Sequence, residues 1–300
     1  MASAAVRTVQ YVSVVVVTRN NREGLVECLD SVENQDFATM ETIVVDNAST
    51  DGTTSEIQAD YPWVNYIDLE EDRGVGAYNV GLEAATGELI IVLSANSRLP
   101  GEGIVSRIVR KFRENKNLGA AGFRTIDPGG EEIDWFRWAE VGDFQSGYLS
   151  PAFLIGAAAI RPEIYERTEG FWEPYYFHVA DQDLATRIIS TGAEIRYFPS
   201  ITFVLDRSAK RRRGTRYKYL ITRNMLWYYW RNYGLARAAY KTGSYLLRLT
   251  GEVLAGKSDF RPVAKGITEG FWGIKRALKT REPVKSRYLP LVEGKELSWN

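Results

Sequence analysis

Three short polar clusters stand at the ends of strongly apolar runs in the first hundred residues. They are Thr18-Arg19-Asn20, Asp46-Asn47-Ala48-Ser49 and Ser94-Ala95-Asn96. Their hydroxyl, amide, carboxylate and guanidinium groups can hydrogen-bond to a polar ligand. If the apolar runs are neighbouring strands of one sheet, the clusters meet at one edge of that sheet and line a single binding crevice.

The apolar runs alternate with amphipathic stretches, as strands alternate with helices in α/β proteins. The run 11–18 is β-branched and nearly continuous, which is typical of a strand buried on both faces. Between residues 22 and 35, apolar side chains recur at helical spacing. Further strands are expected at 42–46, 65–69 and 88–93, and further helices from about 53 and at 76–85, whereas 119–205 is less regular. This order predicts a mostly parallel, doubly wound sheet, which binds ligands beyond the carboxyl ends of its strands.

The length and composition are those of an ordinary globular protein. The chain has 300 residues, of which 45% are hydrophobic and 25% charged, and this suits one large α/β domain with appended helices. Cys28 is the only cysteine, so no internal disulfide can form and a cytoplasmic location is expected. We find no apolar run of about eighteen residues and no signal peptide, so no membrane span is expected.

The net charge of zero conceals an asymmetry along the chain. Residues 206–300 carry 22 Lys and Arg against 7 Asp and Glu, whereas residues 1–205 carry 16 against 31. We therefore place a boundary between a domain at 1–205 and a basic, aromatic-rich helical region at 206–300. The basic region fits an anionic partner, such as phosphate or lipid at the inner face of the plasma membrane, and equally a solvated surface. Its aromatic run 227–230 is interpreted as buried packing, with a membrane-interface belt as the alternative.

Four blocks follow one another along the chain: Val15–Asn20, Val44–Thr53, Arg73–Gly81 and Gly170–Phe177, the last continuing through Asp181-Gln182-Asp183-Leu184 to Arg187. Together they resemble family 2 glycosyltransferases of the GT-A fold, over about two thirds of the chain (12–205). Each block alone is a weak signal, but four in the family's order are a strong one. Within the second block, Asn-Ala-Ser-Thr-Asp-Gly is similar to a rhamnosyltransferase-like branch.

The resemblance implies transfer of a sugar from a nucleotide diphosphate, UDP- or dTDP-linked, to a hydroxyl of a glycan or lipid-linked acceptor, with inversion. Asp181 is implied as the general base that removes the hydroxyl proton, and Asp46 as the group that accepts the imide N–H of uracil or thymine. Further implied nucleotide-sugar contacts are Thr18, Asn20, Arg73, Asn79, Ser94 and Asn96. The implied acceptor or phosphate contacts are His178, Asp183, Arg207 and Arg211.

Several of these residues also fit purely structural roles. Asp46 and Asp181 can cap a turn or helix, and Asp183 suits the first turn of a helix better than Asp181 does. His178, the only histidine, fits a structural position as well as one that orients the acceptor. Arg223-Asn224 resembles a family pair that would connect the basic helix with the cleft.

The sequence departs from the family pattern where a metal ion is usually held. The Asp-x-Asp that follows the strand at 88–93 is replaced by Ser94-Ala95-Asn96, a later His by Leu205, and the acidic residue before the base by Ala180. Hard cations such as Mg²⁺ and Mn²⁺ prefer carboxylate oxygen, so Asn96 and Asp206 are only weak ligand candidates. We expect weak or absent metal dependence, with Arg207 and Arg211 among the cations that offset the charge of the leaving diphosphate.

The leading hypothesis is therefore an active inverting glycosyltransferase of cell-envelope polysaccharide biosynthesis. The alternative is a catalytically silent relative that binds nucleotide or a partner enzyme. A nucleotidyltransferase ranks last, because neither a Gly-rich phosphate loop nor paired metal carboxylates are present. No nucleic-acid partner is expected.

Overall fold

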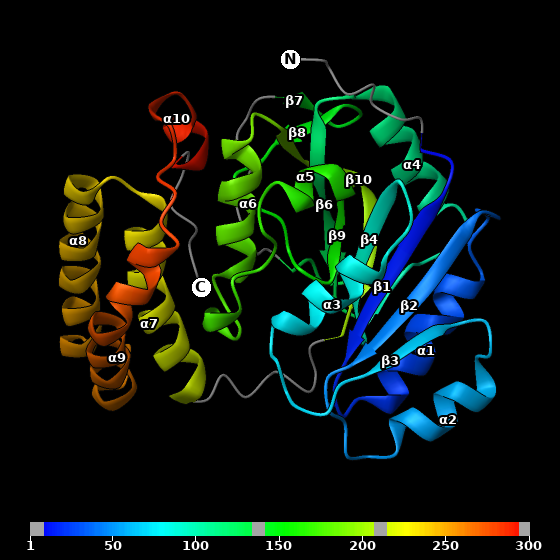
Figure 1. Cartoon of the computed structure of the whole chain (residues 1–300), viewed down its shortest axis with the longest axis horizontal. Coiled ribbons are helices and arrows are strands. Elements are labelled where there is room, and N and C mark those ends of the chain that lie inside the picture. Colours follow the sequence, from blue (N-terminus) through cyan, green and yellow to red (C-terminus); the bar gives the residue numbers. More distant parts are fainter. Residues whose placement is uncertain (1–8, 134–141, 207–214, 294–300) are drawn as a thin grey trace.

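The computed structural model describes residues 9–133, 142–206 and 215–293, which form a central sheet between helices and a separate group of helices at one side (Figure 1). The sheet has the order β3-β2-β1-β4-β9-β6-β10-β8-β7, with β5 paired to β10. Its strands are β1 (Val12–Thr18), β2 (Met40–Asp46), β3 (Asn65–Asp68), β4 (Leu89–Ser94), β5 (Ser97–Arg98), β6 (Leu118–Ile126), β7 (Gly142–Asp143), β8 (Gly147–Leu149), β9 (Ala157–Ile160) and β10 (Glu194–Leu205).

Helices cover both faces of the sheet because its central strands are apolar on both sides. Val14 and Val16 of β1 pack with α1 and α4, whereas Val15 between them packs with α3 and α6. The helices are α1 (Arg22–Glu33), α2 (Thr53–Asp60), α3 (Gly76–Ala84), α4 (Ile104–Glu114), α5 (Pro162–Glu166), α6 (Ala180–Ser190), α7 (Thr215–Asn232), α8 (Leu235–Leu254), α9 (Phe260–Lys279) and α10 (Leu289–Val292), with single 3₁₀ turns at Glu173–Tyr175 and Ser286–Tyr288.

The four strands expected in the first hundred residues are present and parallel. β1 pairs with β2 and β4, and β2 pairs with β3, all in parallel register. The carboxyl ends of β1, β2 and β4 therefore meet at one edge of the sheet, and the prediction of a mostly parallel α/β fold is confirmed.

The second half of the sheet is mixed, which the sequence pattern did not predict. β9 runs antiparallel between β4 and β6, and it is built from Ala157-Ala158-Ala159-Ile160, all buried. Alanine lacks the β-branched signature of a strand. Small side chains at the centre of the sheet instead leave room for the helices on both faces.

The helices that follow β10 pack on the α/β domain and on one another. Trp227 and Tyr228 of α7 are buried in the same apolar cluster as the α3 and α6 face of the sheet. Helix α9 approaches α7 closely, since a Cβ added at Gly270 would stand 2.4 Å from Leu226 Cδ1. The prediction of buried aromatic packing at 227–230 is thus confirmed for Trp227 and Tyr228.

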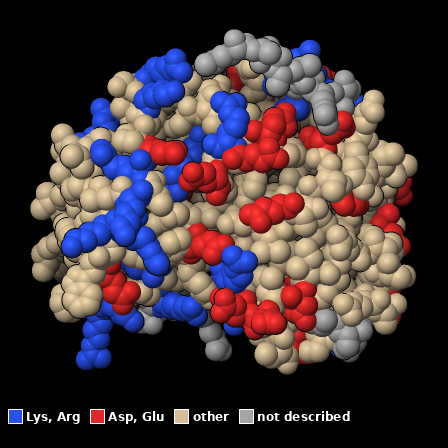
Figure 2. Space-filling model, in the orientation of Figure 1, with Lys and Arg blue, Asp and Glu red and all other residues tan. Residues whose placement is uncertain are grey.

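The charge asymmetry of the sequence is also an asymmetry of the surface. In Figure 2, Lys and Arg gather on the side formed by the C-terminal helices, and Asp and Glu lie mostly over the sheet domain. Among the described residues, no helix combines the length and apolarity that crossing a membrane would require.

Candidate active site

The three polar clusters at the strand ends converge, as the sequence predicted. The Asn20 backbone N–H donates to Ser49 Oγ at 2.8 Å, which joins the end of β1 to the end of β2. The Asn21 side chain donates to Asn96 Oδ1 at 2.7 Å, which joins the end of β1 to the end of β4. The clusters therefore form one continuous polar edge.

Thr18 carries an unsatisfied polar group at this edge. The residue is only 2% exposed, and its Oγ1 is buried without a hydrogen-bond partner among the described residues. Buried hydroxyls are nearly always paired, so this one is suited to a bound ligand or water. Asn20 differs, because it is exposed and its Oδ1 already accepts from the Thr50 backbone N–H at 2.7 Å.

Asp46 bonds to its own turn and to β3, and the expected contact with the nucleotide base stays a prediction. The residue has no exposed surface, its Oδ1 accepts from the Ser49 backbone N–H at 2.9 Å, and its Oδ2 accepts from Tyr66 Oη at 2.7 Å. The side chain thus shapes the turn after β2, which is the alternative role that its residue type allowed.

Asp72 is the centre of the site's hydrogen bonding, and the sequence analysis missed it. It accepts from Asn47 Nδ2 at 2.9 Å and from Tyr176 Oη at 2.5 Å, and it pairs with Arg19. Burial raises the pKa of this carboxyl, but the hydrogen bond from Tyr176 and its other donors outweigh burial and hold the pKa below its usual value. The sequence offered one signal for Asp72, which directly precedes the block Arg73–Gly81.

The segment 72–76 is clamped onto the turn that precedes α6. The Val75 backbone N–H donates to the Tyr176 carbonyl at 2.6 Å. Gly74 permits this approach, because it has φ +55° and an added Cβ would stand 2.2 Å from the Tyr176 oxygen. Arg73 reaches Glu173 Oε1 at 2.6 Å. The blocks Arg73–Gly81 and Gly170–Phe177 are therefore in direct contact.

Asn79 fastens the loop that contains Phe171, and the expected contact with the nucleotide sugar stays a prediction. Its Oδ1 accepts from Tyr165 Oη at 2.6 Å and from the Phe171 backbone N–H at 2.9 Å. Its Nδ2 donates to the Phe171 carbonyl at 2.9 Å. Both ends of the amide are thus engaged by protein, so Asn79 positions the loop instead.

The residues in place of the metal motif make a poor site for a hard cation. Ser94 Oγ lies 3.0 Å from Ser97 Oγ. Asn96 and Asp206, the two weak ligand candidates, are neighbours, since the Asp206 N–H donates to the Asn96 carbonyl at 2.9 Å. Asp206 is the one carboxylate of this set, and its Oδ2 stands 3.9 Å from an Arg98 nitrogen. Across the described ranges, no cluster of three His, Cys, Asp or Glu could hold a metal ion. This donor set does not match the carboxylate-rich shell that Mg²⁺ and Mn²⁺ prefer.

Asp181 lies in the first turn of α6, after a turn with unusual backbone geometry. Tyr176, His178 and Val179 all have positive φ, at 64°, 48° and 67°. Left-handed backbone in residues other than glycine is costly and persists where the surrounding structure enforces it. Here Asn224 of α7 enforces it, because its Nδ2 lies within hydrogen-bonding distance of the carbonyls of residues 175, 177 and 178, at 3.0, 2.6 and 2.9 Å.

Arg223 reinforces the same turn from α7. Its guanidinium donates to the Pro174 and Tyr175 carbonyls at 3.2 and 3.0 Å and stacks 4.4 Å from the Trp227 ring. Arg223 and Asn224 therefore join α7 to the turn before α6 through its backbone carbonyls, and their link to the cleft stays a prediction.

The environment of Asp181 suits a general base. Burial raises its pKa to about 6, although the Gln182 backbone N–H, which donates to Asp181 Oδ1 at 3.0 Å, favours the ionised form. A carboxylate with a pKa near neutrality takes a proton more readily than an ordinary exposed one. Asp181 is thus available for proton transfer at the helix N-terminus.

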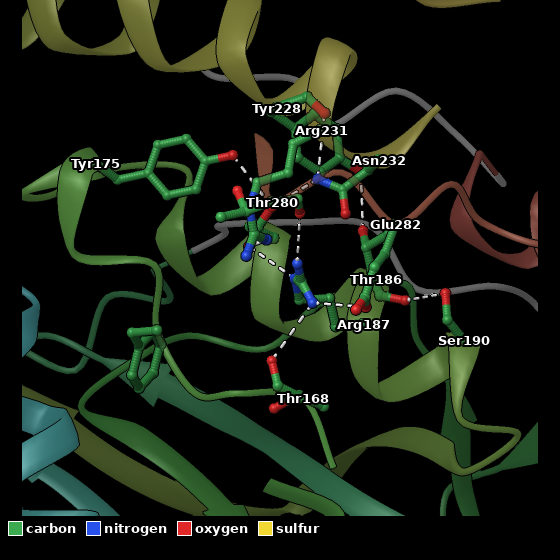
Figure 3. A network of polar contacts seen from close by, with 12 residues as sticks. Thr168, Tyr175, Thr186, Arg187, Ser190, Tyr228, Arg231, Asn232, Thr280 and Glu282 are labelled. Atoms are coloured by element: carbon green, nitrogen blue, oxygen red, sulfur yellow. Dashed lines mark hydrogen bonds and ion pairs between the residues drawn. The ribbon is translucent and has the colours of Figure 1, made fainter. Parts of the chain in front are cut away.

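Asp183 has a structural place between α6 and α7, where it contacts several residues of one polar network. The residue is 1% exposed. Its Oδ2 pairs with Arg231 at 2.7 Å and Arg187 at 3.5 Å. Its Oδ1 accepts from Asn232 at 2.5 Å and Tyr175 Oη at 3.1 Å. Figure 3 shows this network, with Tyr175, Arg187, Arg231 and Asn232 labelled. Both carboxylate oxygens therefore already have protein partners, and the expected contact with acceptor or phosphate stays a prediction.

The remaining sequence candidates fall at the rim of the site or outside the described residues. His178 is half-buried, with its ring edge-on to Tyr217 at 4.7 Å, in the same turn that leads to Asp181. Arg207 and Arg211 lie outside the described residues, in the segment that begins directly after Asp206.

Comparison with known families gives a match over more than half of the chain. The family described as Glycosyl transferase family 2 matches residues 13–185, which include the strand-end clusters and Asp181. The succinoglycan biosynthesis protein ExoO of Rhizobium meliloti is 28% identical over 178 residues, which is 59% of this chain and 50% of that protein. The chain thus spans about half the length of this relative.

Solved structures share the fold over nearly the whole chain. Staphylococcus aureus TarS 1–349, in complex with UDP-GlcNAc, has a TM-score of 0.64 at 17% identity and covers 94% of this chain and 84% of that one. The mannosyltransferase PcManGT of Pyrobaculum calidifontis, in complex with GDP-Man and Mn²⁺, has a TM-score of 0.57 at 20% identity and covers 96% and 87%. At these identities the likeness shows the GT-A fold alone.

Proposed function

We propose, from the premise that this chain belongs to glycosyl transferase family 2, that it transfers a sugar from a UDP- or dTDP-linked donor to a hydroxyl of a glycan or lipid-linked acceptor, with inversion. The donor lies at the joined ends of β1, β2 and β4, where Thr18 has a buried hydroxyl without a partner. The ExoO relative acts in the biosynthesis of a polysaccharide and TarS was solved with a UDP-sugar, and both support this donor and acceptor class.

The position of Asp181 at the start of α6 is the observation that carries the proposal. Single displacement needs one base near the acceptor hydroxyl, and Asp181 is the carboxylate that the enforced turn 176–179 delivers to the start of α6. Ionised Asp181 removes the proton as the hydroxyl oxygen attacks the anomeric carbon, and the nucleotide diphosphate leaves from the opposite face. Attack from the opposite face inverts the anomeric configuration.

The transfer proceeds with little dependence on metal. Ser94, Asn96 and Asp206 are a weak donor set for a hard cation, although the PcManGT structure contains Mn²⁺. Cationic side chains offset the charge that develops on the leaving diphosphate. Arg207 and Arg211 are our candidates, because their segment follows Asp206, whose backbone is bonded to Asn96.

Two substitutions test the assignment of Asp181. Asp181→Asn keeps the shape and the hydrogen bond from Gln182 but cannot take a proton, so donor-dependent transfer should fall by about 10²-fold or more. Asp60→Asn, an exposed residue at the end of α2, is the matched control and should retain full transfer. Equal transfer by wild type and Asp181→Asn would remove Asp181 from the mechanism.

Nucleotide binding, measured together with turnover, distinguishes an active transferase from the catalytically silent alternative. UDP, dTDP and GDP are each added with EDTA or with Mn²⁺ while the melting temperature is recorded. A rise with UDP or dTDP that is equal under EDTA is the expected result. A rise that requires Mn²⁺ would contradict metal independence, and binding without turnover on any donor would favour the silent alternative.

A further inference from the structure

A cavity of about 200 Å³ lies beside the candidate base, between α6, α7, α8 and α10. Gln182, the residue after Asp181, forms part of its wall, together with Ser244 of α8. The polar groups of the donor side do not line it. Five tyrosines from α7, α8 and the connection between them dominate its surface: Tyr228, Tyr229, Tyr233, Tyr240 and Tyr245.

Four of the five tyrosine rings, those of Tyr228, Tyr229, Tyr233 and Tyr245, pack against one another. Tyr228 and Tyr233 meet edge to face with centroids 5.8 Å apart, and Tyr229 and Tyr245 do so at 6.0 Å. Tyr228 and Tyr245 are buried, whereas Tyr240 is 75% exposed. Preformed pockets that combine aromatic walls with a few polar groups suit ligands with both apolar and hydroxyl surface. A sugar ring is such a ligand, since its C–H face packs on an aromatic ring while its hydroxyls form hydrogen bonds.

The charged side chains in the wall are largely neutralised by neighbours. Lys241 Nζ lies 3.1 Å from Glu293 Oε1, and Arg237 reaches Glu293 Oε2 at 2.6 Å. Arg248 stacks 5.1 Å from the Tyr245 ring and has Glu252 at 3.9 Å. Cations that already have anionic partners favour a neutral ligand with many hydroxyls over a phosphate.

Gln182 links the cavity to the candidate base through the chain. It directly follows Asp181 in the first turn of α6, so a ligand that contacts Gln182 binds within one residue of that base. The Gln182 side chain hydrogen-bonds with Tyr228 of the same wall, and its Oε1 is buried and lacks a partner among the described residues. Turning this amide toward the cavity would let a ligand hydroxyl donate to it.

We propose that this tyrosine-lined cavity is an acceptor subsite that binds a sugar unit of a neutral glycan, adjacent to the unit whose hydroxyl is glycosylated. The inference rests on the proposed function for the identity of the ligand as acceptor. It predicts that this enzyme prefers acceptors of at least two sugar units over a single sugar or a simple alcohol.

Blocking the cavity tests the proposal. Ser244 is an exposed residue of α8 in the cavity wall, so Ser244→Trp fills the cavity without disturbing the core. Thr250→Trp adds the same ring to an exposed position of the same helix outside the wall, and it is the matched control. Tyr240→Ala, at the most exposed of the five tyrosines, is a second variant that removes an aromatic surface.

Binding is measured directly by saturation-transfer NMR with maltotriose, cellotriose, chitotriose and a rhamnose trisaccharide. We expect at least one trisaccharide to bind wild type. Its affinity should fall by about tenfold or more in Ser244→Trp and stay unchanged in Thr250→Trp. The proposal is overturned if none of them binds wild type, or if Ser244→Trp binds as wild type does. It is also overturned if pyrophosphate alone binds in the cavity.

Kinetics distinguish failure of this inference from failure of the proposed function. In Ser244→Trp the acceptor KM should rise about tenfold or more, while UDP-induced thermal stabilisation stays as in wild type. An unchanged acceptor KM in an active Ser244→Trp enzyme refutes the subsite and leaves the glycosyltransferase assignment intact. If glycan binds in the cavity but no donor supports transfer, the proposed catalytic activity is refuted, whereas the cavity remains a glycan-binding site.

Discussion

At the scale of single residues, Asp181 and Asp183 show how two carboxylates of one helical turn acquire different properties. Asp183 is enclosed by Arg187, Arg231 and Asn232, which hold it as a structural anchor between α6 and α7. Asp181 has no cationic partner among its pKa-determining neighbours, and burial raises its pKa to about 6. Only the second arrangement leaves a carboxylate able to exchange a proton near neutral pH.

The pKa of Asp181 predicts the acid limb of the activity profile. The base acts when ionised, so kcat/KM should rise with pH, reach half its maximum near pH 6 and level off above about pH 7. The profile is measured with fixed donor and acceptor while circular dichroism confirms that the fold is intact. A midpoint near pH 4, as for an ordinary exposed carboxyl, would contradict the role of burial.

The same shift predicts how Asp181 affects stability. A carboxyl whose folded pKa lies above its unfolded value of 3.8 contributes stability that is present below about pH 4 and lost as pH rises through about 6. At pH 8 Asp181→Asn should therefore be more stable than wild type, by at most about 3 kcal/mol. Urea unfolding at pH 8 and pH 4 checks this, and the gain should nearly vanish at pH 4. A loss of stability at pH 8 would contradict the prediction.

At the scale of elements, α7 is the support on which the active-site turn is built. It contributes Asn224 to carbonyls of the turn before α6 and Arg231 to Asp183, and its buried Trp227 packs on the rings of Trp172 and Tyr175. Helix α9 in turn packs on α7 through glycines such as Gly270. The C-terminal helices thus hold the candidate base through the turn before it.

Removing the Asn224 side chain should affect both stability and catalysis. Asn224→Ala leaves buried carbonyls of the turn without their donor, which we expect to cost about 1–3 kcal/mol of unfolding free energy. The strained turn should relax, so kcat should fall while the thermal shift with UDP is retained. Asn34→Ala, at an exposed asparagine after α1, is the control and should change neither quantity. Unaltered kcat in a folded Asn224→Ala enzyme would show that the turn does not depend on α7.

At the scale of the whole molecule, the distribution of charge gives the protein two unlike sides. The described residues 215–293 carry 16 Lys and Arg against 5 Asp and Glu. On the same helices Leu247, Leu254 and Trp272 are each more than three quarters exposed. Basic residues with exposed apolar side chains fit an anionic lipid surface, where lipid-linked sugars are found.

We predict that the protein binds vesicles containing phosphatidylglycerol and not vesicles of phosphatidylcholine alone. Raising NaCl from about 50 to about 500 mM should weaken binding strongly, because salt screens the attraction. Trp272→Ala should weaken it further, whereas Trp63→Ala, a matched change on the sheet domain, should not. Co-sedimentation with vesicles is the measurement. Equal binding to both vesicle types would contradict an electrostatic membrane contact.

The sequence by itself determined the α/β order, the convergence of the strand-end clusters and the family. These depend on local patterns, since a buried strand is apolar along its length and the polar residue that follows it must lie at the sheet edge. The boundary at residue 205 and the roles of Thr18 and Asp181 stay predictions. The alanine strand β9 had no such pattern and was missed.

Only the tertiary structure decided which polar residues already have protein partners. Asp46, Asn79 and Asp183 have the residue types of a binding site, yet each bonds to other parts of the protein. Asp72 and Gln182 were overlooked, although one organises the site and the other lies at the wall of a cavity. Residue type sets what a side chain can bind, but burial and the partners brought by distant segments decide whether that capacity is left for a ligand.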